Sequence, residues 1–214
     1  MADFPSCRLA QWTDVGHWVD QLAASIRAAN RLPDTLVALT RGGWAPARLL
    51  ADHFGIKRLL ALRTQHWGIT ATPDGHAELT EGLSRGLQGE SVLVVDDITD
   101  TGESLALAVD HVHGLGPARL ESATCLHITH SKFTPTYYAE TIDRDHWVWV
   151  VFPWTYWEDL RTLAGRGFEE TRSVAKTHRL LAERCGLRVP RADVARALAE
   201  VRPTNDSTPA SGNR

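Results

Sequence analysis

Short, unbroken apolar runs alternate with helix-like segments along this chain, and the alternation limits the folds that it can adopt. The two clearest runs are SVLVV at residues 91–95 and TLVALT at residues 35–40. Runs of this length, rich in β-branched residues, are typical of strands that are buried on both faces of a parallel sheet. A helical pattern follows each of them, so the sequence predicts βαβ units around a mainly parallel sheet.

The other segments extend this α/β pattern. Residues 65–90 are rich in glycine and have little periodicity, which predicts a long mobile loop that could contain a hairpin. Residues 202–214 are small and polar and are predicted to be disordered. We predict further strands at residues 58–63, 118–129 and 146–152, and helices at residues 13–30, 44–54, 103–113, 156–166, 170–185 and 191–201.

Length, charge and cysteine usage exclude several classes of protein. The 214 residues and 23.7 kDa suit one domain, or one domain with a small appendage. A formal net charge of −3 gives no general attraction to nucleic acid or anionic lipid. Three widely spaced cysteines exclude a disulfide framework and a CxxC metal site. Since no signal peptide or long apolar run is evident, we expect a cytoplasmic protein that neither binds nucleic acid nor enters a membrane.

The segment VVDDITDTGES at residues 94–104 carries the most specific chemistry in the chain. Two carboxylates, Asp96 and Asp97, directly follow the buried strand, and a turn with hydroxyl residues leads from them into a helix. Ligands of parallel α/β sheets bind beyond the carboxyl ends of the strands, where the amides at the start of a helix attract anions. Gly102 would allow a ligand to approach the backbone of this turn.

Phosphate donors and diol acceptors occur together in this segment. The hydroxyl groups of Thr99, Thr101 and Ser104 can donate to phosphate oxygens, whereas Asp96 and Asp97 can accept from a vicinal diol or hold Mg²⁺ through water. Together they describe a ribose 5-phosphate site. The alternatives are an acid pair that only caps a helix and the acid pair of a response regulator. A P-loop is excluded, because the pattern GxxxxGK[ST] does not occur.

This segment resembles the signature with which type I phosphoribosyltransferases bind 5-phosphoribosyl 1-pyrophosphate (PRPP). The shared features are an apolar strand, two acids, two variable residues, Asp-Thr-Gly and a small or hydroxyl residue. The resemblance implies that Asp96 and Asp97 bind the ribose hydroxyls and influence the metal. It also implies that Asp100 lies near the purine N7, where the family has a general base or proton acceptor. The residues implied around the 5′-phosphate are Thr99, Asp100, Thr101, Gly102, Glu103 and Ser104.

A second element is the sequence Thr40, Arg41, Gly42 and Gly43 at the end of the first predicted strand. Its two glycines let backbone amides approach a pyrophosphate, and Arg41 supplies a cation. It resembles the family's pyrophosphate loop. The resemblance implies a cis peptide bond between Thr40 and Arg41 and a catalytic role for Arg41. Taken by itself, an RGG sequence is usually only a turn.

A third set of residues is similar to the base site of bacterial xanthine-guanine phosphoribosyltransferases and of related archaeal purine enzymes. Lys132 follows a predicted strand, and Trp149 stands four residues before Pro153-Trp154. The resemblance implies that Lys132 donates to the purine O6, that Trp149 stacks on the base and that Val150 offers backbone groups to its edge. Trp147 is the second stacking candidate. The alternative is that these tryptophans are ordinary core or interface residues.

The chain departs from the bacterial pattern after the Pro-Trp pair. Thr155 stands where those relatives have an acid, and Glu158 or Asp159 could take the place of that acid. The preferred base is therefore left open among guanine, xanthine and hypoxanthine.

The loop that is expected to close over the reacting centre also differs. It has no arginine or lysine between His66 and Glu81. Arg63 or Arg85 could reach the pyrophosphate, or Arg41 could act alone.

The resemblance implies the type I phosphoribosyltransferase fold, an α/β fold with a central mainly parallel sheet flanked by helices, a small hood region and, in this chain, a C-terminal helical extension. We expect a core with its hood at residues 1–166, the extension at residues 167–201 and a disordered tail at residues 202–214. The extension is predicted to serve packing or subunit contact, and a homo-oligomer, by preference a dimer, is expected.

The predicted function is transfer of the 5-phosphoribosyl group of PRPP to a 6-oxopurine base in purine salvage, with Mg²⁺ as the cofactor. Two alternatives stay open. One is a regulatory protein of this fold that senses PRPP or nucleotides, and the other is a phosphoribosyltransferase for a different base, such as adenine, uracil or orotate.

Overall fold

The computed structural model describes residues 4–66 and 77–200, which fall into two compact units. One unit is Ala10–Trp154, and the other combines Met1–Leu9 with Thr155–Arg214. The boundary predicted after residue 166 lies within helix α4 (Tyr156–Thr171), all of which belongs to the second unit.

The larger unit is built around a sheet with the strand order β4-β3-β2-β5-β6-β7. Neighbouring strands run parallel, except β3 and β4, which pair antiparallel. The mainly parallel sheet that the apolar runs predict is therefore confirmed. In chain order the strands are β2 (Thr35–Thr40), β3 (Leu59–His66), β4 (Ala77–Glu81), β5 (Ser91–Thr99), β6 (Arg119–Ile128) and β7 (Tyr137–Ile142).

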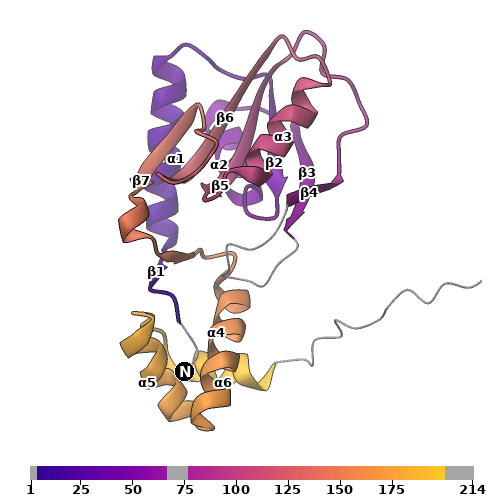
Figure 1. Ribbon diagram of the computed structural model, residues 1–214. Helices are drawn as coiled ribbons and strands as arrows, with labels where there is room; N and C mark the ends of the chain where they lie inside the picture. Colours follow the sequence, from indigo (N-terminus) through magenta and orange to yellow (C-terminus); the bar gives the residue numbers. More distant parts are fainter. Residues whose placement is uncertain (1–3, 67–76, 201–214) are drawn as a thin grey trace, which may run out of the picture. The chain divides into compact units, whose positions relative to one another are not determined.

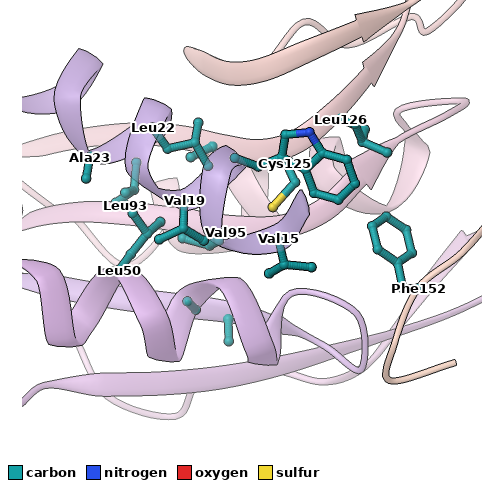
Figure 2. Close-up of a cluster of buried hydrophobic side chains, with 14 of the residues drawn as sticks. Val15, Val19, Leu22, Ala23, Leu50, Leu93, Val95, Cys125, Leu126 and Phe152 are labelled. Atoms are coloured by element: carbon teal, nitrogen blue, oxygen red, sulfur yellow. The ribbon is translucent and has the colours of Figure 1, made fainter. Parts of the chain in front are cut away.

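Helices pack on both faces of this sheet (Figure 1). Leu36 of β2 belongs to the core formed with α1 (Trp12–Ala28) and α2 (Trp44–Phe54), whereas its neighbour Val37 belongs to the core formed with α3 (Glu103–His113). Successive strand residues point to opposite faces, so one unbroken apolar run supplies both cores. Figure 2 shows the first core, whose labelled members include Val15, Val19, Leu22, Leu50, Leu93, Val95 and Cys125.

Strands β7 and β8 are among those that differ from the sequence prediction. Residues 137–142, for which we predicted neither a strand nor a helix, form β7 at the edge of the sheet. The sequence YYAETI is partly polar and mostly half-exposed, so it lacks the apolar run that marks a central strand. Strand β8 (Trp149–Val151) is shorter than the strand predicted at residues 146–152, because the short 3₁₀ helix η1 (Arg144–His146) precedes it.

The segment predicted as a loop at residues 65–90 contains the end of β3 and the whole of β4. Strand β3 continues to His66 and pairs with β4, with a register shift between Arg63 and Thr64. Residues 67–76 lie outside the described residues, so the mobility that we predict for this loop stays a prediction.

The second unit contains strand β1 (Cys7–Leu9) and the helices α4, α5 (Val174–Arg184) and α6 (Arg191–Ala199). The hydroxyl group of Tyr156 in α4 donates to Asp193 in α6, with an O–O distance of 2.6 Å. Helix α4 buries Leu160 and Leu163, and helix α5 buries Leu180 and Leu181. In residues 4–66 and 77–200, no helix combines the length and the apolarity that crossing a membrane requires.

Candidate functional site

The carboxyl ends of three neighbouring parallel strands lie at the same edge of the sheet. Register pairs connect them, with Ala38 of β2 opposite Val95 of β5 and Thr99 of β5 opposite His127 of β6. The segments that follow these strands therefore meet, as is usual for ligand sites in parallel α/β sheets. They carry the sequence-predicted residues Arg41, Asp100 and Lys132, together with His130.

The loop after β2 packs directly against the acid pair of β5. The peptide bond between Thr40 and Arg41 is cis, as the resemblance implied. A Cβ atom on Gly42 would overlap the carboxylate of Asp97, and one on Gly43 would overlap the carbonyl oxygen of Val95. Both positions therefore require glycine, and the two predicted PRPP-binding elements are in direct contact.

This contact gives a prediction about Gly43. A Cβ there would also lie 2.8 Å from the Cα of Asp96, which is backbone that cannot move aside. We expect Gly43→Ala to lower the free energy of unfolding by about 1–3 kcal/mol, the usual cost of overpacking. Chemical denaturation measures the change. Gly16→Ala is the control, because nothing lies within 4 Å of that position in α1, and it should raise stability by up to about 1 kcal/mol. A Gly43→Ala protein as stable as wild type would contradict the contact.

The two acids of β5 differ in their surroundings. Asp97 is buried, with 8% of its surface exposed, and its Oδ2 accepts a hydrogen bond from the indole Nε1 of Trp154 at 3.0 Å. Asp96 is half-buried, and its Oδ1 accepts from the backbone N–H of Asp97 at 2.9 Å. Asp96 is thus the more open of the two to a ligand, whereas Asp97 also supports the glycine loop.

Burial raises the pKa of both carboxyls, and the charge of Asp97 raises the pKa of Asp96 further. Two adjacent carboxylates are therefore costly to ionise in the unliganded protein. Hydrogen bonds from Trp154 and the backbone offset only part of that cost. Such a pair is suited to a ligand that brings hydroxyl donors or a cation to it.

This electrostatic cost predicts that Asp96→Asn stabilises the unliganded protein. The folded-state pKa of Asp96 is raised, so ionisation destabilises the fold above that pKa, and this cost disappears as the pH falls and the carboxyl is protonated. We expect a gain of about 1 kcal/mol at pH 7.5, or about 2–4 °C in Tm, that shrinks towards pH 4. Calorimetry at both pH values measures it, with Asp110→Asn on the exposed side of α3 as the control. A lower Tm at pH 7.5 would contradict the account.

The turn after β5 is held by the segment that follows β6. Gly102 has a φ of +86°, and a Cβ there would lie 2.7 Å from the backbone nitrogen of Phe133. The backbone N–H of Lys132 donates to the carbonyl oxygen of Thr101 at 3.0 Å. Helix α3 then begins at Glu103, whose N–H lies 3.4 Å from the hydroxyl oxygen of Thr101. The start of a helix is therefore fixed at the predicted phosphate position.

One predicted phosphate donor points away from this position. Thr99 is 1% exposed, and its hydroxyl group is hydrogen-bonded to that of Thr124 at 3.1 Å. Strand β5 continues to Thr99, and the alternation along a strand puts Thr99 on the same buried face as Asp97. The side chain of Thr99 is therefore a core residue, and only its backbone can contribute to the site. Ser104 is half-buried in the first turn of α3.

Asp100 is the centre of a small polar cluster. Its Oδ1 lies 2.7 Å from Nε2 of His130, and the same oxygen accepts from Nε1 of Trp147 at 3.2 Å. The side chains of His130 and Asp100 are 34% and 39% exposed, so the cluster stays open to solvent. Trp147, the second stacking candidate, thus contacts the predicted proton acceptor.

In the described part of the chain, no side-chain hydrogen bond or ring contact connects the predicted base-binding residues with one another. Lys132 is exposed, and its backbone N–H donates to the carbonyl oxygen of Thr101. Trp149 is half-buried in β8, and Val150 is 8% exposed. Their roles towards a purine therefore stay predictions.

The acids proposed to replace the missing one after the Pro-Trp pair belong to the second unit. Asp159 is 3% exposed and accepts a hydrogen bond from the hydroxyl of Thr155 at 2.6 Å, while Glu158 is exposed. The candidate loop cations are engaged locally. Arg63 lies 3.5 Å from Glu81 and Arg85 lies 2.5 Å from Glu90.

Sequence reasoning missed His130 and the role of Trp154. His130 was not among the predicted site residues, although it stands two residues before Lys132, just after a strand adjacent to β5. Because the carboxyl ends of neighbouring parallel strands meet, that position could have identified it. No local signal indicated that Trp154 would donate to Asp97, 57 residues away in the chain.

Comparisons with known proteins agree with this geometry. A family model described as the phosphoribosyl transferase domain matches residues 8–159. A purine phosphoribosyltransferase from Pyrococcus horikoshii is 25% identical, with a TM-score of 0.60 over 69% of this chain and 93% of that one. A xanthine-guanine-hypoxanthine phosphoribosyltransferase from Helicobacter pylori is 20% identical, with a TM-score of 0.57 over 73% and 99%.

A protein from Neisseria gonorrhoeae solved with bound ppGpp is also similar, at 20% identity and a TM-score of 0.60 over 72% of this chain and 91% of that one. The likeness to this protein and to the Helicobacter enzyme shows the fold alone. The family model, in contrast, spans more than half of the chain and includes both loops of the site. The chain therefore belongs to the phosphoribosyl transferase family, has the type I fold and is an enzyme of the phosphoribosyltransferase class.

Proposed function

We propose that the protein transfers the 5-phosphoribosyl group of PRPP to a 6-oxopurine base, namely guanine, xanthine or hypoxanthine, and releases pyrophosphate. One observation carries the proposal: the glycine loop at Gly42 lies against the carboxylate of Asp97. PRPP bears its pyrophosphate on C1, next to the ribose diol. A PRPP site therefore needs an anion-binding loop beside diol acceptors, and this contact satisfies that requirement.

Each part of PRPP has a counterpart in the chain. The pyrophosphate would lie on Thr40, Arg41, Gly42 and Gly43, with Arg41 as its cation. The ribose diol would donate to Asp96 and Asp97, of which Asp96 is the more exposed. The 5′-phosphate would be held by backbone amides from Thr99 onwards and by the hydroxyls at the start of α3. The residues proposed around it are Thr99, Asp100, Thr101, Gly102, Glu103 and Ser104.

The donor set fits a magnesium ion that PRPP brings with it. In the described part of the chain, no group of three or more His, Cys, Asp or Glu side chains could enclose a metal ion. Asp96 and Asp97 offer two carboxylates whose raised pKa values a cation would lower. Mg²⁺ commonly takes one or two protein carboxylates, with water and substrate oxygens as its other ligands. When bound, it would neutralise charge on the pyrophosphate.

A third set of residues would recognise the purine base. A flat aromatic face, proposed for Trp149, binds any purine, whereas the ammonium group of Lys132 selects an O6 acceptor over the N6 amino donor of adenine. Val150 would offer backbone groups to the purine edge. Asp100 would accept the proton that the base loses at N7 as N9 attacks C1 of the ribose.

Arg41 and the acid pair would stabilise different charges as the reaction proceeds. As the bond between C1 and the pyrophosphate oxygen loosens, negative charge grows on the leaving group, and Arg41 stabilises it. The acid pair holds the ribose while positive charge grows at C1. We propose that the loop predicted at residues 65–90 excludes the water that would otherwise hydrolyse PRPP.

The test is to incubate the protein with magnesium and PRPP and each of hypoxanthine, guanine, xanthine, adenine, uracil and orotate, and to measure pyrophosphate release. We expect release with one or more of the 6-oxopurines and none with the other three bases. Release with adenine, uracil or orotate alone would contradict the choice of base. Tight PRPP binding without release for any base would favour the regulatory alternative.

A further inference from the structure

Side chains from two separate segments contact the same oxygen of Asp100. Nε2 of His130 lies 2.7 Å from Oδ1, and Nε1 of Trp147 lies 3.2 Å from it. His130 follows β6, and Trp147 follows η1, 30 and 47 residues away from Asp100 in the chain. The described residues place no hydrogen bond on the other carboxylate oxygen, Oδ2.

The contacts of Asp100 distinguish its two oxygens. An indole N–H can only donate, so Oδ1 acts as an acceptor towards Trp147, and towards a carboxylate Nε2 of His130 is a donor as well. Oδ1 is thus occupied by two contacts. Oδ2, which has no hydrogen-bond partner among the described residues, is the oxygen open to a proton from a ligand.

We propose that His130 and Trp147 are positioning residues, which orient the carboxylate of Asp100 so that Oδ2 accepts the purine proton. This inference rests on the proposed function. In the step concerned, the N7–H bond of the purine breaks, its electron pair stays in the ring, and the proton forms an O–H bond with Oδ2. The purine N9 meanwhile bonds to C1, and pyrophosphate leaves with the electron pair of the C1–O bond.

The physical need for such anchoring follows from the exposure of Asp100. The terminal torsion of an aspartate is broad, and a carboxylate that is 39% exposed would turn and exchange water partners freely. Two directed hydrogen bonds on one oxygen restrict that torsion before the substrate binds. An error of about 1 Å in the position of a reacting group can lower the rate about 10²-fold. We therefore expect this orientation of Asp100 to raise the rate of the reaction.

The test compares His130→Ala, Trp147→Phe and the double variant. Trp147→Phe keeps an aromatic ring and removes only the N–H donor. We expect each single variant to lower kcat about 10-fold and the double variant about 100-fold, with an unchanged KM for PRPP. His130→Gln should recover most of the activity, because its amide can donate from near the position of Nε2. His113→Ala, at an exposed position at the end of α3, is the control.

A double-mutant cycle that combines His130→Ala with Asp100→Asn distinguishes a positioning role of His130 from a general structural effect. If His130 acts through Asp100, removing it in the Asp100→Asn protein should cost no further rate. Full kcat in both His130→Ala and Trp147→Phe would overturn the proposal, as would additive losses in this cycle. If His130→Ala fails to fold, Trp147→Phe and His130→Gln still decide the question. A wild-type protein that releases no pyrophosphate with any base would instead refute the proposed function.

Discussion

Replacement of Asp100 by asparagine is expected to lower kcat about 10²- to 10⁴-fold, the usual contribution of a general base. The amide oxygen of the variant can still accept from His130 and Trp147, so the local structure should persist. What is lost is the second oxygen, Oδ2, which cannot be replaced by an amide nitrogen that already carries protons. Steady-state kinetics with a 6-oxopurine base measures the effect.

The binding of PRPP provides the internal comparison for this variant. Titration calorimetry should show an affinity for magnesium PRPP close to that of wild type, since Asp96 and the glycine loop are untouched. Asp110→Asn, which removes an exposed carboxylate from the same region, should leave kcat unchanged. If Asp100→Asn kept wild-type kcat, Asp100 would not be the proton acceptor.

Replacement of Arg41 by alanine is expected to lower kcat about 10²- to 10³-fold, as removal of a preorganised electrostatic contact often does. Arg41 follows the cis peptide bond and precedes Gly42, which packs on Asp97. Its charge would thus be next to the pyrophosphate that leaves C1. Arg63 and Arg85 pair with acids of their own segments, whereas Arg41 stands on the loop that contacts Asp97, so Arg41 is our candidate cation.

Two further variants test whether the loss of activity depends on the guanidinium group at position 41. Arg41→Lys keeps the charge but loses the planar guanidinium fork, so we expect it to recover only part of the rate. Arg48→Ala removes an exposed arginine from α2 that lies 3.5 Å from Asp52, and it should leave turnover unchanged. Wild-type turnover of Arg41→Ala at saturating PRPP would show that this loop does not stabilise the leaving group.

The parts of the site that sequence predicted are those formed by continuous segments at strand ends. The acid pair, the Asp-Thr-Gly turn and the glycine loop each follow a buried strand, and parallel pairing of β2 and β5 brings them together. Apolar runs reveal such strands because central strands are buried on both faces. The cis bond at Arg41 was predicted through family resemblance rather than from any local pattern.

The features that sequence did not predict depend on contacts between distant segments or on the exact length of a strand. Strand β7 was missed because an edge strand with one exposed face needs no apolar run. Thr99 was assigned to the phosphate because we ended the strand at residue 95, whereas β5 continues to Thr99 and directs that hydroxyl into the core. The bond between His130 and Asp100 spans 30 residues, and the only signal for it in the sequence is the position of His130 just after a neighbouring parallel strand.

The most direct test of the central claim is a crystal structure of the protein with ribose 5-phosphate and Mg²⁺. The claim is that the turn after β5 holds the phosphate on the amides that lead into α3 and the sugar diol on its acid pair. We expect density for the phosphate next to Thr101 and Gly102, and for the two hydroxyl groups next to Asp96. Sugar phosphate bound elsewhere, with this turn empty, would contradict the claim.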